Sequence, residues 1–259
     1  MSTCVRRVCL AACLAGLPFS AVLLAGPQQS ASAASERRLV FPKGRASGLN
    51  GSYWQAALAN GGPAPRHERL LVVMPDGLVL GVVDGERDRV MLPIDLTREL
   101  SERELQALLV HNHPSCVSLS RSDLMHLAKI GVAGVVAVGS DGTVFEASAA
   151  PRYDPDLFAE RLYPQLKNRV QERLATEASR DRVDLAMLDP HLAHLVAVVL
   201  HRARVIDYRV TPSVTAGLAH TRFRDLFERV IGPEVRRLEL ELPAPTSPAP
   251  PGKPFGRRQ

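Results

Sequence analysis

The sequence contains few cysteines and few aromatic residues, and each shortage excludes a class of protein. Cys4, Cys9 and Cys13 lie at the N-terminus, which leaves Cys116 alone in the main body of the chain. A disulfide framework is therefore excluded there. Aromatic residues make up 5% of the chain, and no stacking surface of the kind that binds single-stranded nucleic acids is evident.

Charge of one sign is not concentrated in any part of the chain. The formal net charge is +5, but the arginines are spread along the sequence, and we therefore expect no specific binding to nucleic acid. The extended apolar run over residues 8–24 contains Pro18 and is short for a membrane-spanning helix. We expect no membrane span in the mature chain. The hydrophobic share of 46% is ordinary for a globular protein.

Residues 1–34 have the features of an export signal. Arg6 and Arg7 give a positive start, an apolar stretch follows, and an alanine-rich segment ends in an Ala-x-Ala-like cleavage pattern. We therefore predict a signal peptide and an exported protein, either periplasmic or secreted. The alternative is a wrongly assigned start codon in an alanine-rich genome, in which case the protein would be cytoplasmic.

The rest of the chain divides into four segments by composition. These segments are residues 35–66, 67–150, 151–242 and 243–259. The first is rich in Gly, Ala and Pro and is interpreted as an arm that Tyr53 and Trp54 pack onto the domain. The second alternates short apolar runs with turns. The third has mainly helical periodicity and is interpreted as a helical extension, and the fourth is a proline-rich tail predicted to be disordered.

The second segment predicts a mixture of strands and helices. The expected strands are residues 70–74, 78–83, 89–92, 108–110, 135–138 and 143–146, and the expected helices are residues 101–106 and 122–130. In the extension we expect helices over residues 156–178, 190–203 and 221–231, with Pro164 as a possible break in the first, and a strand over residues 205–210. This pattern indicates an α+β fold in which helices flank one mixed sheet.

A candidate metal site follows the strand expected at 108–110. His111 and His113 are separated by one residue, so on a strand both side chains point to the same face. Both rings can then reach one ion at about 2.0–2.1 Å. Pro114 ends the strand, and Asp123 at the start of the next helix can turn back as a third ligand. Two histidines and one carboxylate leave a fourth position for water, which is typical of catalytic zinc sites.

This segment resembles the JAMM (MPN+, JAB-domain) zinc metallopeptidases, in which a glutamate precedes His-x-His-Pro and Ser-x-x-Asp. The resemblance covers about residues 67–147 and extends to bacterial and phage members of the family. It implies a JAB/MPN-like (cytidine-deaminase-like) sheet and a Zn²⁺ ion as cofactor. The implied zinc ligands are His111, His113 and Asp123.

The same resemblance implies two further roles. Ser120 would stabilise the oxyanion that forms during hydrolysis. Glu68, directly before the first strand, would be the catalytic base. Four other glutamates fit less well because they lie in a turn or on the short helix; they are Glu86, Glu99, Glu102 and Glu104. The loop between His113 and Ser120 is one residue shorter than in the most familiar members, which weakens the assignment of Ser120.

Several of these residues also have simpler explanations. Ser120-x-x-Asp123 is an ordinary helix capping box, so Ser120 can cap, catalyse or do both. His126 lies one helical turn beyond Asp123 and is expected to be exposed. His191 and His194 share a helix face, for which an amphipathic helix is a simpler explanation than a second metal site. The string His-Asn-His also matches the name of the HNH nucleases, but their motif is distributed along the chain.

The sequence therefore predicts a zinc-dependent metallopeptidase or isopeptidase that acts on a protein or peptide substrate. The alternative is a JAB-like binding or accessory module with little catalytic activity, associated with a toxin, phage or mobile-element system. Retention of every candidate ligand favours the enzyme. No specific substrate follows from the sequence.

Overall fold

The computed structural model describes residues 32–33, 38–40, 49–59, 66–87, 89–103, 105–115 and 117–243. Apart from residues 32–33, the predicted signal peptide lies outside these ranges, and so does the predicted tail after Pro243. Among the described residues, no helix has the length and apolar character needed to cross a membrane.

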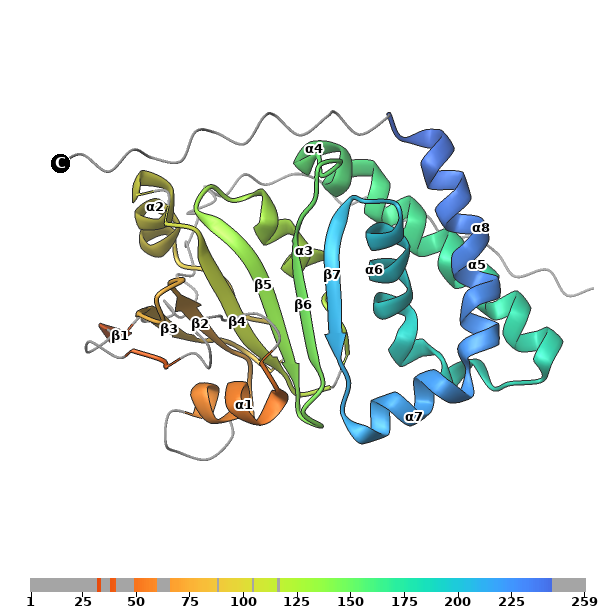
Figure 1. Cartoon of the computed structure of the whole chain (residues 1–259), viewed down its shortest axis with the longest axis horizontal. Coiled ribbons are helices and arrows are strands. Elements are labelled where there is room, and N and C mark those ends of the chain that lie inside the picture. The colour runs from red at the N-terminus through yellow and green to blue at the C-terminus, as the bar shows by residue number, and fades with distance from the viewer. Residues whose placement is uncertain are drawn as a thin grey trace, which may run out of the picture.

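The strands form one mixed sheet in the order β1-β3-β2-β4-β5-β6-β7 (Figure 1). They are β1 (Ser32–Ala33), β2 (Arg69–Val73), β3 (Val79–Asp84), β4 (Ala107–His113), β5 (Val132–Gly139), β6 (Val144–Ala149) and β7 (Ile206–Thr211). Strands β4 and β5 are parallel, whereas the other neighbouring pairs are antiparallel. The predicted α+β class is confirmed.

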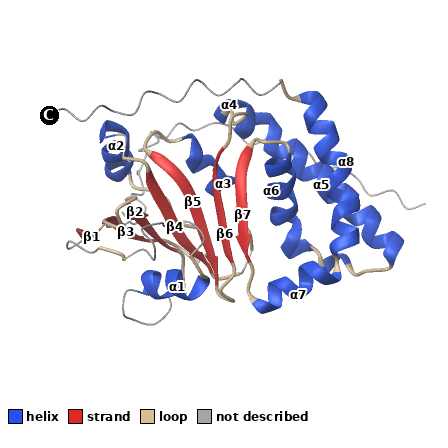
Figure 2. Cartoon of the chain, viewed as in Figure 1, coloured by secondary structure: helices blue, strands red, loops and turns tan. Residues whose placement is uncertain are grey.

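The α-helices lie around this sheet and are collected mainly at its β7 side (Figure 2). They are α1 (Gly51–Ala59), α2 (Ile94–Arg103), α3 (Arg121–Met125), α4 (Pro155–Leu157), α5 (Tyr163–Asp181), α6 (Leu192–Arg202), α7 (Val214–Arg222) and α8 (Arg224–Glu241). A 3-10 turn, His126–Ala128, continues α3. A π-helical segment, Phe158–Leu162, joins α4 to α5. The chain therefore stays helical through Pro164, and the possible break predicted there is only a change of helix type in the preceding turn.

Alternation along the strands creates two hydrophobic cores, one on each face of the sheet. Leu109 of β4 belongs to the larger core, to which α2, α3, α5, α6 and α8 contribute. Val110, the next residue, belongs to the smaller core, which Trp54 and Leu58 of α1 cover. Because side chains alternate along a strand, His111 and His113 share the face of Leu109. The metal-site histidines therefore point toward the helical layer.

The second segment was predicted well for its strands and less well for its helices. Predicted strands at 70–74, 78–83, 108–110, 135–138 and 143–146 correspond to β2 to β6. The predicted strand at 89–92 is wrong, because its backbone turns toward α2 and the free edge of β3 is paired by β1 instead.

The predicted helix at 101–106 begins too late. Helix α2 starts at Ile94, and it buries Leu96 and Leu100, one turn apart, against the sheet. Helix α1 was not predicted at all, although the packing role of Trp54 is confirmed, since this side chain is fully buried. The helix predicted at 122–130 is α3 with its 3-10 continuation, and it ends before Gly131.

The C-terminal segment contributes a strand to the sheet in addition to the helices that pack beside it. The strand predicted at 205–210 is β7, which pairs with β6. The predicted helix end at Gly232-Pro233 is wrong, because α8 continues through Pro233. Beyond this proline, the buried carboxylate of Glu234 accepts hydrogen bonds from Arg169 (2.8 Å) and Arg173 (3.1 Å) of α5. These bonds and the packing of α8 on α5 hold the helix together where proline removes a backbone hydrogen bond.

Candidate metal centre

Strand β4 brings the two predicted histidine ligands together. His111 and His113 are both buried, and their ring centroids lie 4.6 Å apart at an interplanar angle of 66°. The Nε2 atoms of the two rings are 2.9 Å apart. Pro114 follows in a turn, which ends the strand immediately after the second histidine. The prediction that both side chains share one face of the strand is confirmed.

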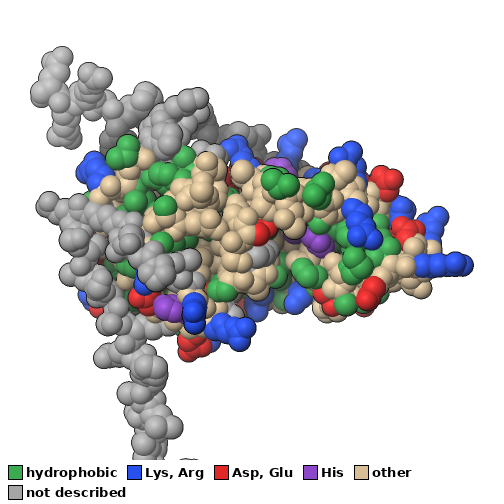
Figure 3. All heavy atoms as spheres, turned by 90° about the horizontal axis from the view of Figure 1, so that it is seen from below, with side chains coloured by type: hydrophobic (Ala, Val, Ile, Leu, Met, Phe, Trp, Pro, Cys, Tyr) green, Lys and Arg blue, Asp and Glu red, His purple; other side chains and the backbone are tan. Residues whose placement is uncertain are grey.

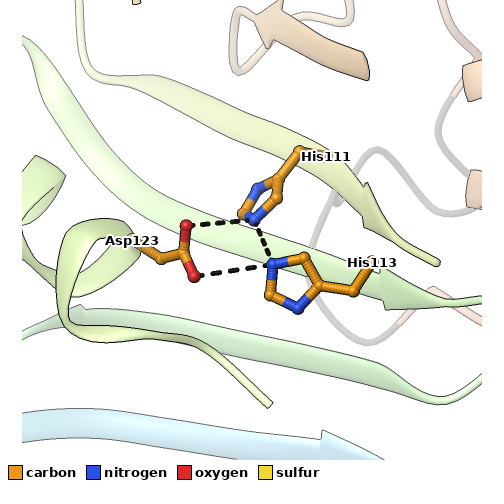
Figure 4. Close-up of side chains that lie close together, drawn as sticks. All are labelled: His111, His113 and Asp123. Carbon is orange, nitrogen blue, oxygen red and sulfur yellow. Dashed lines mark hydrogen bonds and ion pairs between the residues drawn. The ribbon is translucent and has the colours of Figure 1, made fainter. Parts of the chain in front are cut away.

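Asp123 is directed at the histidines by the helix cap that it helps to form. The backbone N–H of Ser120 donates to Oδ2 of Asp123 at 2.6 Å, and the N–H of Asp123 donates to the Ser120 hydroxyl at 3.3 Å. This capping box holds the carboxylate at the first turn of α3. Figure 4 shows the carboxylate facing both rings. Its Oδ1 lies 3.2 Å from Nε2 of His111, and its Oδ2 lies 3.5 Å from Nε2 of His113.

These distances fit a metal ion at the centre of the group. In a tetrahedral site with bonds of about 2.0–2.1 Å, neighbouring ligand atoms stand about 3.3 Å apart. The observed separations of 2.9, 3.2 and 3.5 Å lie on either side of that value. His111, His113 and Asp123 thus form a group that can hold a metal ion, and no other group of three metal-ligating side chains is this compact among the described residues.

The hydrogen bond on the far side of His113 prepares its ring for this role. Nδ1 of His113 lies 2.8 Å from the carbonyl oxygen of Val117. A carbonyl only accepts, so Nδ1 carries the proton, and the neutral ring presents its lone pair at Nε2. With a carboxylate directed at the same point, such a donor set is stabilised by a cation between the groups. The donor chemistry therefore agrees with the distances.

The electrostatics of the group reflect burial and mutual attraction. Burial disfavours the charged form of His113, but the hydrogen bond and charge of Asp123 outweigh burial and raise the pKa of His113. Burial likewise disfavours ionised Asp123, yet the charge of His111 and the hydrogen bonds from both histidines lower the pKa of Asp123 well below its ordinary value. The carboxylate is thus ionised at neutral pH and is able to act as a ligand.

Glu68 lies beside the metal group without belonging to it. Its side chain is buried, and its Oε1 is 3.9 Å from Nε2 of His113. The backbone of Glu68 is held by two hydrogen bonds, from its N–H to the Glu86 carbonyl at 2.7 Å and from the Gly85 N–H to its carbonyl at 2.8 Å. A buried carboxylate next to three converging ligands is placed where a general base could act.

Asn112 positions Glu68, a role that was not predicted. Its side chain points to the start of β2, where Nδ2 donates to the His67 carbonyl at 2.9 Å and Oδ1 accepts from the Arg69 N–H at 2.7 Å. These two bonds clamp the backbone on either side of Glu68. The residue between the two histidines therefore fixes the glutamate while its neighbours face the metal. Its place inside the motif was the signal available from sequence.

Asn112→Ala is expected to lower the free energy of unfolding by about 1–3 kcal/mol, because it leaves a backbone donor and acceptor unpaired. Asn112→Asp keeps the oxygen that accepts from Arg69 but sets a second carboxylate oxygen against the His67 carbonyl, so it should also be destabilised. Equilibrium denaturation of the two variants beside the wild type measures the difference. Equal stability of Asn112→Ala and wild type would contradict the role of the clamp.

Ser120 acts as the N-cap of α3, as its simpler explanation proposed. Its hydroxyl accepts from the Asp123 N–H and lies 2.7 Å from the hydroxyl of Ser122. The side chain also lines the pocket at the metal group. Capping and pocket position are compatible, and stabilisation of an oxyanion by Ser120 stays a prediction.

A pocket of about 680 Å³ opens onto the metal group. Its lining includes Glu68, His113, Ser120 and Asp123. His126 lines it too, so the expectation that this residue is exposed is wrong: the 3-10 turn after α3 rotates its ring into the half-buried wall. The pocket gives a ligand direct access to the predicted site.

The C-terminal segment reaches the site through a buried polar chain. The hydroxyl of Ser118, in the loop after β4, lies 2.7 Å from the hydroxyl of Tyr208 on β7, which lies 3.0 Å from Nδ1 of His194 on α6. Burial, with a smaller contribution from His220, lowers the pKa of His194 to about 3. His194 therefore serves as a neutral hydrogen-bonding partner, and the alternative of a second metal site with His191 has no support among the described residues.

Comparison with family models, with curated proteins and with solved structures found no match to this chain. The JAB/MPN-like architecture suggested by the motif therefore stays a prediction. Functional interpretation depends on the geometry of the metal group, the neighbouring glutamate and the sequence motif that contains them.

Proposed function

We propose that this protein is a zinc-dependent peptidase or isopeptidase. One observation carries the proposal: the ligand atoms of His111, His113 and Asp123 converge at 2.9–3.5 Å, with the buried Glu68 carboxylate 3.9 Å from one of them. Structural zinc sites are normally closed by four protein ligands, whereas catalytic sites keep one position open. Three protein ligands beside a general base and an open pocket match the catalytic type.

The three ligands divide the work of holding zinc. The two imidazoles would each offer the lone pair of Nε2 to the ion, and the Asp123 carboxylate would supply the negative charge that partly offsets it. A bound zinc ion supplies a Lewis acid and makes water a nucleophile at neutral pH. The JAMM resemblance of the motif supports the same donor set.

The chain's own residues then handle the proton and the developing charge. Glu68 takes the proton of the attacking water and returns it to the departing amine. Ser120, on the pocket wall, is the proposed donor to the carbonyl oxygen as its negative charge grows. The same steps apply to a peptide and to an isopeptide bond, because both are amides.

Removal of the metal tests this proposal. Protein that hydrolyses a mixed-sequence peptide library should lose that activity after dialysis against a chelator and recover it after addition of zinc, as followed by mass spectrometry of the cleaved products. Hydrolysis that survives complete removal of metal would contradict the proposed chemistry. Magnesium added in place of zinc is a control, because it prefers oxygen ligands in an octahedral arrangement.

A further inference from the structure

Cationic side chains gather in the pocket at the metal group. Arg89, Arg121 and Lys129 all line it. None of the three has a carboxylate within ion-pairing distance among the described residues. Instead, Arg89 donates to the sulfur of Met91, and Arg121 donates to the carbonyl oxygen of Ala159. The carboxylates of Glu68 and Asp123 line the same pocket, so its three cations and two anions leave a formal charge of +1, which a bound divalent metal would increase.

Some of the other surface cations of the described chain are neutralised by carboxylates. Ion pairs engage arginines on several elements, including Arg69 with Asp84, Arg202 with Glu228 and Arg229 with Glu177. On the face shown in Figure 3, basic and acidic side chains are interspersed. Arginines without an ion pair among the described residues also occur elsewhere, for example Arg222 and Arg236, so the pocket is distinguished by the gathering of three such cations on one lining.

Two side chains in the pocket carry an energetic cost that a ligand would relieve. Lys129 is half-buried, and burial lowers the pKa of its ammonium group, with no carboxylate nearby to oppose the shift. Nδ1 of His126 is buried, and no described residue provides a hydrogen-bond partner for it. An anionic oxygen stabilises a partly desolvated cation, and it accepts a hydrogen bond from His126 in the tautomer that carries its proton on Nδ1.

Part of the pocket wall is apolar. Val90, Met91 and Met125 contribute side chains to it, and Met91 is 52% exposed although it is a large hydrophobic residue. Methionine adapts to partners of different shape. A ligand that places a carboxylate against the cations and an aliphatic stem against this wall would satisfy both parts of the pocket.

The pocket also continues toward the C-terminal helices. A second hollow, of about 570 Å³, shares Val117 and residues 120–122 with the first and extends to Lys167 on α5. An extended chain crossing these shared residues would pass from the metal group to another cation. The shape therefore suits a peptide better than a compact small molecule.

We propose that the substrates of this site are acidic peptides, with glutamate or aspartate side chains flanking the bond presented to the metal group and held by Arg121 and Lys129. This inference rests on the proposed peptidase function for its biological meaning. The recognition itself depends only on the pocket, so binding can be measured without cleavage. Glutamate suits the site better than phosphate, because its two methylene groups can pack on the Val90 and Met91 wall.

Fluorescence anisotropy with two labelled peptides of equal length, a Gly-Glu repeat and a Gly-Gln repeat, tests the proposal. The full chain, with metal and after chelation, should bind the Gly-Glu peptide at least about tenfold more tightly. The double variant Arg121→Gln, Lys129→Gln should abolish this preference. The matched control Arg222→Gln, Arg236→Gln removes the same charge from α7 and α8 and should keep it.

Each contrary result has a distinct meaning. Equal binding of the two peptides, or an equal loss in the control variant, overturns the acidic-peptide proposal, even if the protein cleaves neutral peptides and is thus a peptidase. A preference for a single-stranded oligonucleotide over the Gly-Glu peptide overturns it as well. If the preference holds in protein that binds no zinc and cleaves nothing, the proposed peptidase function fails while the assignment of the ligand class stands.

Discussion

Glu68→Gln is expected to lower the rate of peptide hydrolysis by about 10²- to 10⁴-fold, the range that a positioned general base contributes. Glutamine has the same shape as glutamate but cannot accept the proton of the attacking water. Glu68 is 7% exposed and stands outside the ligand set, so the variant should still bind zinc. The rate at saturating peptide, with zinc content measured on the same sample, checks both statements.

Glu86 provides a matched control for this variant. Its side chain is exposed, and it supports Glu68 only through its backbone carbonyl, which accepts from the Glu68 N–H. Glu86→Gln removes the same charge from the neighbouring strand end and should leave the rate within about twofold, since exposed substitutions of this kind rarely matter. A comparable loss in the two variants, or a Glu68→Gln rate close to wild type, would exclude Glu68 as the base and favour a binding module.

Replacement of a single metal ligand is expected to weaken zinc binding by more than about a hundredfold, because outer-sphere partners alone account for about 10–100-fold. His113→Gln and Asp123→Asn are the most informative variants. Glutamine preserves much of the buried volume of His113, and asparagine keeps an oxygen that can accept from the N–H of Ser120. Titration calorimetry at neutral pH gives the affinities, and thermal denaturation shows whether each variant is folded.

His191→Gln serves as the control for these titrations, since His191 is half-buried on the C-terminal helices and outside the metal group. It should bind zinc as the wild type does.

Zinc binding by the wild type should also weaken as the pH falls, because protons compete with the metal for the ligands. The raised pKa of His113 means that this competition starts at a higher pH than for an ordinary histidine. Unaltered zinc affinity in His113→Gln would show that zinc does not bind at the proposed metal group.

The metal ligands could be predicted because they lie close together in the sequence at spacings that fix their relative positions. A one-residue separation placed His111 and His113 on one face of β4, and the helix start placed Asp123 opposite them. Strands rich in β-branched residues, such as β5, were predicted equally well. These features depend on residues within a few positions of one another, which is the distance over which sequence patterns carry information.

Features that depend on distant contacts were missed. Helix α1 lies in a Gly- and Ala-rich stretch, and it is held by burial of Trp54 against the sheet. Helix α8 passes through Pro233 because Glu234 is bound by two arginines of α5. The clamp formed by Asn112 and the chain from Ser118 to Tyr208 join segments that are 43 to 90 residues apart. The sequence around either residue of such a pair does not predict the contact between them.

Metal analysis of the full-length wild-type protein, purified without chelator, tests the central claim most directly. The geometry of His111, His113 and Asp123 predicts about one zinc ion per chain, in line with one mononuclear site, and the ion should be absent from His113→Gln prepared in the same way. A folded wild-type protein that holds no zinc, even after incubation with an excess of the ion and removal of what is unbound, would contradict the proposed metal centre and the peptidase function built on it.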